Sequence, residues 1–434
     1  MTNIPFYLGE QAIDELVRYC QARNLEHFFL IADRNTYPIL GQAAEQALQA
    51  QGWDVRTLIY AAHDVVPDET FIVQALVQTD WVERMFLAVG SGVITDITRF
   101  VSHRTRRPFL SLPTAPSVDG FTSPSASLVL DGIKKTVVSQ PPEAIFAHLP
   151  TLAAAPQAMI AAGYGDILGK AIALADWKLG NLLWDEPYSA AIAARVRQTL
   201  ETCLAATDEI GQATPGGIEK LMNALVDSGL CMLDFGNSRP AAGAEHYMSH
   251  FLEMKFLAEG RPAVLHGAKV ALCSLAVAEL YDRLRQMTRA EMVERLRTIP
   301  LPDRDADIQR IRDIYGPIAD SLVLEQAPFL NLTPHAYTQL KGRVLENWED
   351  IQALAGGGGG AAGGGGGGRG GAPPGSRPPP PPPGRVARRT RPAWRCGRVK
   401  SNRPCAIPIF SATGLRFASW GACWVSKPDC KQRK

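Results

Sequence analysis

The 434-residue chain has few cysteines, almost no net charge and no long hydrophobic run. Eight cysteines are few for this length, and the four in residues 1–354 show no CxxC spacing, so we expect reduced thiols in a cytoplasmic protein. No run of about 18 uncharged apolar residues occurs, which argues against a membrane span. The N-terminus has no basic segment followed by an apolar one, which argues against a signal peptide.

The formal net charge of +2 is the sum of two unequal parts. Residues 355–434 carry 15 basic side chains and one acidic side chain, whereas residues 1–354 carry 30 basic and 42 acidic ones. The first 354 residues therefore have a net charge of −12, and the remainder has a net charge of +14. An acidic body argues against a nucleic-acid-binding surface on it.

Residues 355–434 form a low-complexity basic tail with 18 of the 39 glycines and 12 of the 32 prolines. Such a segment buries too little apolar surface to offset the entropy lost on ordering, so we predict that it is disordered. It could serve as a basic, proline-rich arm for an acidic partner or nucleic acid. Alternatively, a GC-rich coding sequence read out of frame gives the same residue bias. We hypothesise such a frameshift near residues 353–356, where a helical pattern stops without a cap.

Residues 1–150 alternate strand and helix patterns, which is typical of a doubly wound, Rossmann-like and mostly parallel sheet. Asp68 follows a proline and is expected to cap a helix. The Asp131-Gly132 pair predicts the turn of a hairpin. Helices are expected over residues 12–25, 42–50, 68–78 and from 94 to 101, strands over 28–32, 55–60, 85–89, 109–112 and 144–149, and the hairpin over 128–138.

Residues 151–354 show helical patterns without strand-like alternation. At roughly 150 residues per domain, the body is long enough for two domains. We therefore expect an α/β domain at residues 1–150, an all-helical domain at 151–354 and the tail at 355–434, with a ligand in the cleft between the two domains. Helices are expected over residues 156–163, 165–183, 188–206, 217–235, 244–258, 266–282, 289–297, 305–321 and 334–354.

Two neighbouring segments of the α/β domain could contact a nucleotide. A Gly-Ser-Gly turn at residues 90–92 follows a strand and opens a helix, where backbone N–H groups can bind phosphate. Many α/β proteins carry such a turn for packing alone, and this chain lacks the GxGxxG fingerprint and the Walker lysine. Residues 113–127 form a hydroxyl-rich loop that follows the next strand and carries Asp119, although an ordinary turn-rich connection would look similar.

Histidine placement in the helical domain suggests a metal site. His246 and His250 are four residues apart and share one helix face, and His266 begins the next helix. Asp166 opens an otherwise apolar helix, with Lys170 one turn later. One carboxylate and two or three imidazoles suit Zn²⁺, Ni²⁺ or Fe²⁺. The alternative is a set of unrelated surface or capping residues, and no HExxH motif is present.

In chain order the sequence contains the motifs Gly-Ser-Gly, Pro-Thr-Ala-Pro-Ser-Val-Asp-Gly-Phe-Thr-Ser, Gly-Tyr-Gly-Asp, Ser-Arg-Pro-Ala-Ala-Gly-Ala-Glu-His-Tyr-Met-Ser-His and Leu-His-Gly. Together they resemble the sn-glycerol-1-phosphate dehydrogenases of the bacterial type, within the iron-containing alcohol dehydrogenase and dehydroquinate synthase superfamily. The resemblance covers about residues 5–354. The loop of this chain reads Pro-Ser-Val-Asp, where archaeal members have Ser-His-Asp.

The resemblance implies a dinucleotide-binding first domain and a metal- and substrate-binding second domain. It implies that Asp166, His246 and His266 bind one divalent metal, zinc, nickel or iron. Asp119, Asp166 and His250 would act on the substrate. NAD or NADP would contact the following residues of the turn and the loop: Gly90, Gly92, Val93, Ile94, Thr95, Asp96, Thr114, Ala115, Pro116, Ser117 and Ser123.

The implied activity is reversible, metal-dependent and NAD(P)H-linked reduction of dihydroxyacetone phosphate to sn-glycerol 1-phosphate, for synthesis of glycerophospholipid-type lipids. The implied protein is a cytoplasmic homo-oligomer with a small phosphorylated substrate. Lys170 could bind that phosphate or could pair with a nearby acid. The alternatives are a glycerol or other alcohol dehydrogenase of the same superfamily and, with a poorer motif fit, a dehydroquinate synthase. Members usually continue past the position of Ala355 with a further helical segment, so an inactive truncated homologue or a protein that binds through its basic tail also stays open.

Overall fold

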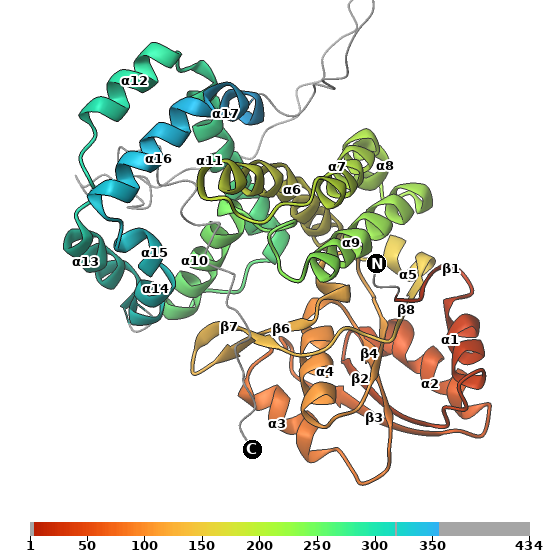
Figure 1. Ribbon diagram of the computed structural model, residues 1–434. Helices are drawn as coiled ribbons and strands as arrows, with labels where there is room; N and C mark the ends of the chain where they lie inside the picture. The colour runs from red at the N-terminus through yellow and green to blue at the C-terminus, as the bar shows by residue number, and fades with distance from the viewer. Residues whose placement is uncertain (1–3, 317–318, 356–434) are drawn as a thin grey trace, which may run out of the picture.

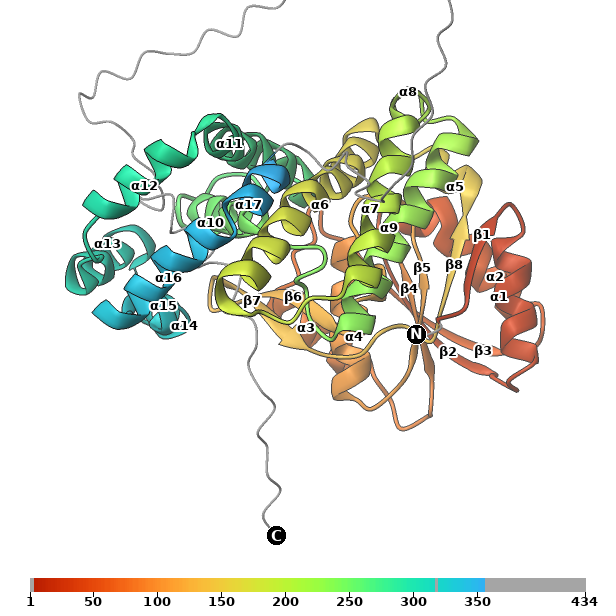
Figure 2. The same cartoon turned by 45° about the horizontal axis from the view of Figure 1, so that its top comes forward.

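The structure is a computed structural model that describes residues 4–316 and 319–355 (Figure 1). An α/β part at the N-terminal side is followed by a part built from helices, as the sequence predicts. Figure 2 shows the helical part packed along one side of the sheet. Residues 356–434 lie outside the described residues, so the disorder and the frameshift expected for the tail stay predictions.

Six strands form a parallel sheet in the order β1-β8-β5-β4-β2-β3. The predicted strands are confirmed to within one residue at each end, and only the short, half-buried β1 was not predicted. β4 is buried along its whole length, which explains its uninterrupted apolar sequence. The strands are β1 (Phe6–Gly9), β2 (His27–Asp33), β3 (Asp54–Tyr60), β4 (Met85–Val89), β5 (Phe109–Leu112) and β8 (Ala144–His148).

Helices cover both faces of this sheet. On one face, α1 (Ala12–Gln21) and α2 (Gln42–Gln49) share a hydrophobic core with Phe28 and Leu30 of β2. On the other face, α3 (Glu69–Val77) and α4 (Gly92–Arg104) pack with Phe29 and Ile31 of the same strand. Because successive side chains of a strand point to opposite faces, β2 must be apolar at every interior position. The doubly wound fold class is confirmed.

Local signals predicted several ends and turns of the α/β part. The Asp68 carboxylate caps α3 by accepting from the backbone N–H of Thr70 and Phe71 at 2.9 and 3.2 Å. A separate antiparallel hairpin, β6 (Ser125–Leu130) and β7 (Ile133–Val138), turns at Asp131-Gly132, where both residues have positive φ. Helix α1 ends four residues earlier than predicted. The π-helical turn η1 (Tyr37–Gly41) before α2 was not predicted.

The second part contains only helices among its described residues, as predicted. The short helices α5, α8 and α15 were not predicted. The elements are α5 (Leu149–Ala153), α6 (Gln157–Trp184), α7 (Ala190–Ala205), α8 (Thr207–Gly211), α9 (Pro215–Phe235), α10 (Ala244–Ala258), α11 (His266–Gln286), α12 (Arg289–Thr298), α13 (Arg304–Tyr315), α14 (Ala319–Glu325), α15 (Ala327–Leu330), α16 (Pro334–Glu346) and α17 (Trp348–Ala355).

Helix α6 is the central element of the helical part (Figure 1). Its 28 residues contribute to four hydrophobic clusters, shared with α9, with α7, with α10 and α11, and with α12, α16 and α17. The prediction of two helices, 156–163 and 165–183, is wrong, because Gly163 and Gly165 lie inside one continuous helix. The predicted helices 305–321 and 334–354 are also each divided, the second of them at Asn347.

Helix α6 is also the one described helix that is long and apolar enough to cross a membrane. The search for an uncharged run in the sequence did not identify this helix, because Asp166 and Lys170 interrupt its apolar stretch. However, 67% of its apolar window is buried inside the protein, where other helices pack around it. This burial is typical of the core helix of a folded bundle.

A contact between α6 and α11 gives a test of the helix packing. A Cβ on Gly267 would overlap the backbone carbonyl of Ala162, which cannot move without shifting α6. We expect Gly267→Ala to lower the free energy of unfolding by about 1–3 kcal/mol, as measured by denaturant titration. The control is Gly342→Ala in α16, where a Cβ meets nothing within 4 Å. It should stabilise the protein by about 0.5–1 kcal/mol. Equal effects of the two substitutions would contradict this packing.

Candidate active site

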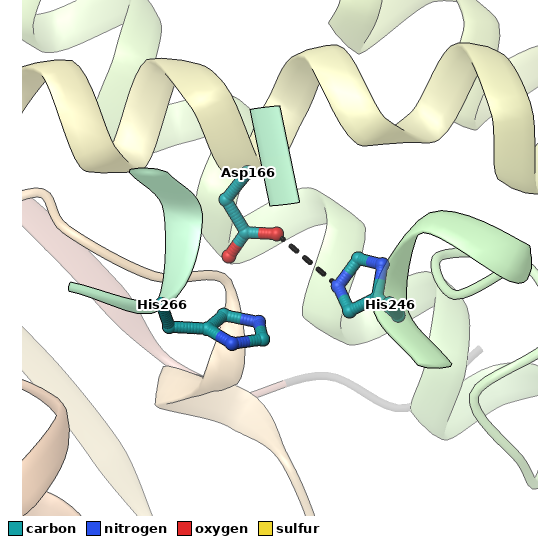
Figure 3. Close-up of side chains that lie close together, drawn as sticks. All are labelled: Asp166, His246 and His266. Carbon is teal, nitrogen blue, oxygen red and sulfur yellow. Dashed lines mark ion pairs between the residues drawn. The ribbon is translucent and has the colours of Figure 1, made fainter. Parts of the chain in front are cut away.

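Three side chains from three helices converge at the junction of the two parts (Figure 3). Asp166 comes from α6, His246 from α10 and His266 from the first residue of α11. Their ligand atoms all lie within 4.8 Å of one another, and His246 Nε2 is 3.5 Å from Asp166 Oδ1. Asp166 lies more than two turns inside α6, so the prediction that it opens a helix is wrong.

The donor set and its environment fit a divalent metal ion. Asp166 is fully buried, and His266 Nδ1 is buried without a hydrogen-bond partner among the described residues. A buried polar atom without a partner is costly unless something binds it. One carboxylate oxygen and two imidazole nitrogens suit borderline metals such as zinc, nickel and iron.

The protonation of two of these groups also suits a ligand role. Burial would raise the pKa of Asp166, but Lys170 and the hydrogen bond with His246 outweigh it and hold that pKa well below its usual value. Burial lowers the pKa of His266 to about 3. Asp166 is therefore an anion and His266 a neutral imidazole at neutral pH, the forms in which each can donate electrons to a metal.

Glu245 holds the His246 ring in place, and the sequence analysis did not identify this role. Its buried carboxylate lies 2.6 Å from His246 Nδ1 and also accepts from the backbone N–H of Gly243 at 3.0 Å. Burial lowers the pKa of His246, but its contacts with Asp166 and Glu245 outweigh burial and raise that pKa to about 9. A metal ion would replace the proton on Nε2, while Glu245 keeps the proton on Nδ1. The only sequence signal is that Glu245 immediately precedes His246, whereas in an HExxH motif the glutamate follows the first histidine.

Asp119 joins the α/β part to this cluster. Its backbone N–H donates to Asp166 Oδ2 at 3.0 Å, and its carboxylate accepts from Ser228 Oγ at 2.9 Å. Lys170 Nζ lies 2.8 Å from Asp119 and 2.9 Å from Asp166. Lys170 is fully buried, and the two carboxylates outweigh burial and raise its pKa. Of the two roles considered for Lys170, the structure shows the salt bridge to acids.

His250 lies one turn beyond His246 on α10 and close to His266, with ring centroids 5.9 Å apart. Burial, together with surrounding cations that include Lys134, holds the pKa of His250 well below its usual value. The structure therefore brings His250 next to the metal-type cluster as a neutral imidazole. A neutral imidazole ring has one N–H donor and one acceptor nitrogen.

The predicted cofactor segments lie side by side at the carboxyl ends of two paired strands. β4 ends at Val89, and the backbone N–H of Gly90 donates to the carbonyl of Leu112, the last residue of β5. A Cβ on Gly92 would contact the side chain of Val118, so the turn touches the loop after β5. The loop residues Thr114, Ala115, Pro116 and Ser117 are all buried.

Individual residues of these segments differ in what they can offer a cofactor. Ile94 packs in the core, so it can present only its backbone. Thr95 is buried, and its hydroxyl has no hydrogen-bond partner among the described residues, which fits a contact with a bound group. Val93 is half-buried, and the Ser123 hydroxyl bonds to the backbone of Ser125. Asp96 pairs with Arg99 at 2.5 Å, and burial raises the pKa of Asp96 to about 6.

Arg99 of α4 holds the Asp119 loop in place through hydrogen bonds, a role that the sequence analysis did not predict. Its buried guanidinium donates to the carbonyls of Gly120, Phe121 and Ser125 at 2.6, 2.9 and 3.2 Å. The ion pair with Asp96 orients it. From the sequence, an arginine three residues after an aspartate is indistinguishable from a surface helix pair.

Comparison with known proteins gives both family and fold. Residues 7–156 match the sequence model of the iron-containing alcohol dehydrogenases. Glycerol-1-phosphate dehydrogenase [NAD(P)+] of Bacillus subtilis is 40% identical over 344 residues, covering 76% of this chain and 87% of that protein. The protein of the same name from Sulfolobus acidocaldarius is 30% identical over 358 residues, covering 81% and 96%.

Solved structures support the fold alone, because their sequence identities are low. A probable glycerol dehydrogenase from Sinorhizobium meliloti has a TM-score of 0.53 at 18% identity, covering 81% of this chain and 97% of that one. Glycerol dehydrogenase from Schizosaccharomyces pombe also has a TM-score of 0.53, at 17% identity, covering 81% and 90%.

The buried lysine between two carboxylates gives a test of how the site is held together. Lys170→Met would leave Asp119 and Asp166 facing each other without a cation. We expect the free energy of unfolding to fall by about 3–5 kcal/mol, because breaking a buried ion pair strands the remaining charge. The control is Lys220→Met, which removes an exposed pair with Glu209. It should change stability by less than about 1 kcal/mol in the same denaturant titration. A small effect of Lys170→Met would show that the two acids do not depend on it.

Proposed function

The chain belongs to the glycerol-1-phosphate dehydrogenase family, and we propose that it catalyses the reversible NAD(P)H-dependent reduction of dihydroxyacetone phosphate to sn-glycerol 1-phosphate. The observation that carries the proposal is the cluster of Asp166, His246 and His266, joined through Asp119 to the loop beside the glycine turn. A metal-type cluster next to a dinucleotide-type turn is the arrangement that a metal-assisted hydride transfer needs.

Asp166, His246 and His266 would hold one divalent ion. The matched family model is named for iron, and the same donor set accepts zinc or nickel. When bound, the ion acts as a Lewis acid that stabilises negative charge on the substrate oxygen. Glu245 keeps His246 in the tautomer that binding requires.

The other site residues would bind and orient the reactants. Asp119, fixed by Lys170 and Ser228, would accept a hydrogen bond from a substrate hydroxyl. His250 would orient the substrate through its neutral ring and relay the proton that the alkoxide takes up. Asp119, Lys170 and Ser228 are buried and His250 is half-buried, so these groups would limit the access of water to the transfer.

NAD or NADP would lie along the glycine turn and the loop after β5. The N-terminus of α4 offers free backbone N–H groups and the positive end of the helix dipole to the cofactor phosphates. Gly90, Gly92 and Val93 would approach through their backbone. The Thr95 hydroxyl and the buried segment from Thr114 to Ser117 would line the rest, with Asp96 and Ser123 at its edge.

The domain division and the setting of the enzyme are part of the proposal. The end of β8 at His148 supports a boundary near residue 150 between the cofactor domain and the helical domain of residues 151–354. Four buried cysteines without disulfides, Cys20, Cys203, Cys231 and Cys273, support a reducing cytoplasm. The exposed Leu272 and Leu275 on α11 would be covered in a homo-oligomer, whose size light scattering would measure.

Removing the metal should remove activity. We expect NADH oxidation with dihydroxyacetone phosphate to stop after chelation and to return on adding Zn²⁺, Ni²⁺ or Fe²⁺. His246→Ala and His266→Ala should each lower kcat/KM by more than about a hundredfold and should lower the bound metal measured by mass spectrometry. The control is His63→Ala at an exposed position. Full activity of a chelated, metal-free sample would refute the metal assignment.

Substrate choice separates this function from glycerol dehydrogenase. In the oxidative direction we expect kcat/KM for sn-glycerol 1-phosphate to exceed that for glycerol by more than about a hundredfold, since two charge-assisted hydrogen bonds to a phosphate contribute about 1.5–3 kcal/mol each. Steady-state kinetics with NAD and NADP as oxidants measure the ratio. A preference for glycerol would favour the other branch of the superfamily.

A further inference from the structure

A second group of charged side chains lies outside the residues assigned so far. Lys134 of the β6–β7 hairpin, Glu253 of α10 and Lys269 of α11 meet in one cluster. Glu253 Oε2 is 2.6 Å from Lys134 Nζ and 3.1 Å from Lys269 Nζ. The two lysine side chains are only 13% and 5% exposed. The cluster therefore holds two cations and one anion in a largely buried place.

This cluster lies beside the metal-type site. Lys269 follows His266 by three residues on α11, and Glu253 follows His250 by three residues on α10, so each pair shares a helix face. Lys134 comes from the α/β part and reaches α10 across the junction. The contact with Glu253 therefore holds Lys134 about one turn of α10 from His250.

The charge balance here is the opposite of the balance around Lys170. Lys170 is one cation between the two carboxylates of Asp119 and Asp166. At the second cluster, two ammonium groups share the carboxylate of Glu253, so these three side chains together carry one surplus positive charge. Burial together with Lys134 lowers the pKa of Lys269. A buried surplus cation is costly for the protein alone and becomes favourable when an anion binds.

The ligand that fits is a phosphate. A phosphate monoester carries close to two negative charges at neutral pH and three oxygens that accept hydrogen bonds from ammonium groups. We propose that Lys134 and Lys269 bind the phosphate of the substrate, while Glu253 pairs with both ammonium groups when the phosphate is absent. This inference rests on the proposed function, which supplies a phosphorylated substrate at the neighbouring metal-type cluster.

The proposal also gives the hairpin a role. Lys134 and Lys135 are adjacent on β7, so their side chains point to opposite faces. Lys134 points to α10, whereas Lys135 is exposed and lies 4.0 Å from Asp131 at the hairpin turn. A bound phosphate would link the hairpin of the first part to α11 of the second. Lys135 is therefore a matched control at the same hairpin.

The test measures phosphate binding and turnover separately. Calorimetric titration with inorganic phosphate and with dihydroxyacetone phosphate is carried out on the metal-loaded enzyme and on Lys134→Met, Lys269→Met and Lys135→Met. We expect Lys134→Met and Lys269→Met to weaken binding of both ligands by about ten- to a hundredfold and to raise KM for dihydroxyacetone phosphate by a similar factor. Lys135→Met should bind and turn over like the wild type.

Glu253→Gln distinguishes a phosphate site from an ion-pair network that only joins the hairpin to α10. It breaks both ion pairs but keeps both lysines, so we expect severalfold tighter phosphate binding. A purely structural network predicts weaker binding instead, as for the lysine variants, and that outcome would overturn the proposal. So would wild-type affinity for both ligands in Lys134→Met and Lys269→Met. If the wild type fails to reduce dihydroxyacetone phosphate but binds phosphate through these lysines, only the proposed function fails.

Discussion

The buried ion pairs of Lys170 with Asp119 and Asp166 constrain the rest of the structure. Two carboxylates and one ammonium group lie away from water, and none of them can remain charged there without the others. Asp119 belongs to the loop after β5, while Asp166 and Lys170 belong to α6. Neutralising these charges therefore fixes the loop of the sheet against the central helix. The metal-type cluster and the cofactor-type turn become neighbours as a result.

Two further buried polar contacts hold the surroundings of this ion pair. Arg99 binds three carbonyls of the Asp119 loop, which would otherwise be left without partners in the interior. The Glu245 carboxylate binds the ring of His246 and accepts from the backbone N–H of Gly243 at the start of α10. Apolar packing sets the layers of the fold, whereas these charged contacts fix the orientation of individual side chains of the site. Such preorganisation is what a hydride transfer requires of a protein.

The acidic body, with a net charge of −12, repels an anionic substrate at long range. Local arrangements therefore have to supply the attraction. In our proposals, the N-terminus of α4 binds the cofactor phosphates, and Lys134 and Lys269 bind the substrate phosphate. Both arrangements attract an anion only at short range. The two lysine side chains are also largely buried, so salt screens their charges little.

The sequence by itself determined the features that depend on neighbours along the chain. The strands, the Asp68 cap, the Asp131-Gly132 turn and the shared helix face of His246 and His250 follow from local spacing and turn chemistry. Tertiary structure decided whether the chain breaks at Gly163 and Gly165. Glycine is read locally as a helix breaker, but here its missing side chain lets another backbone approach α6. Tertiary structure also decided which acids Lys170 meets and that Lys134 reaches Glu253, 119 residues away. These partners depend on how helices cross, which no local pattern encodes, because a buried charge takes its partner from whichever element packs against it.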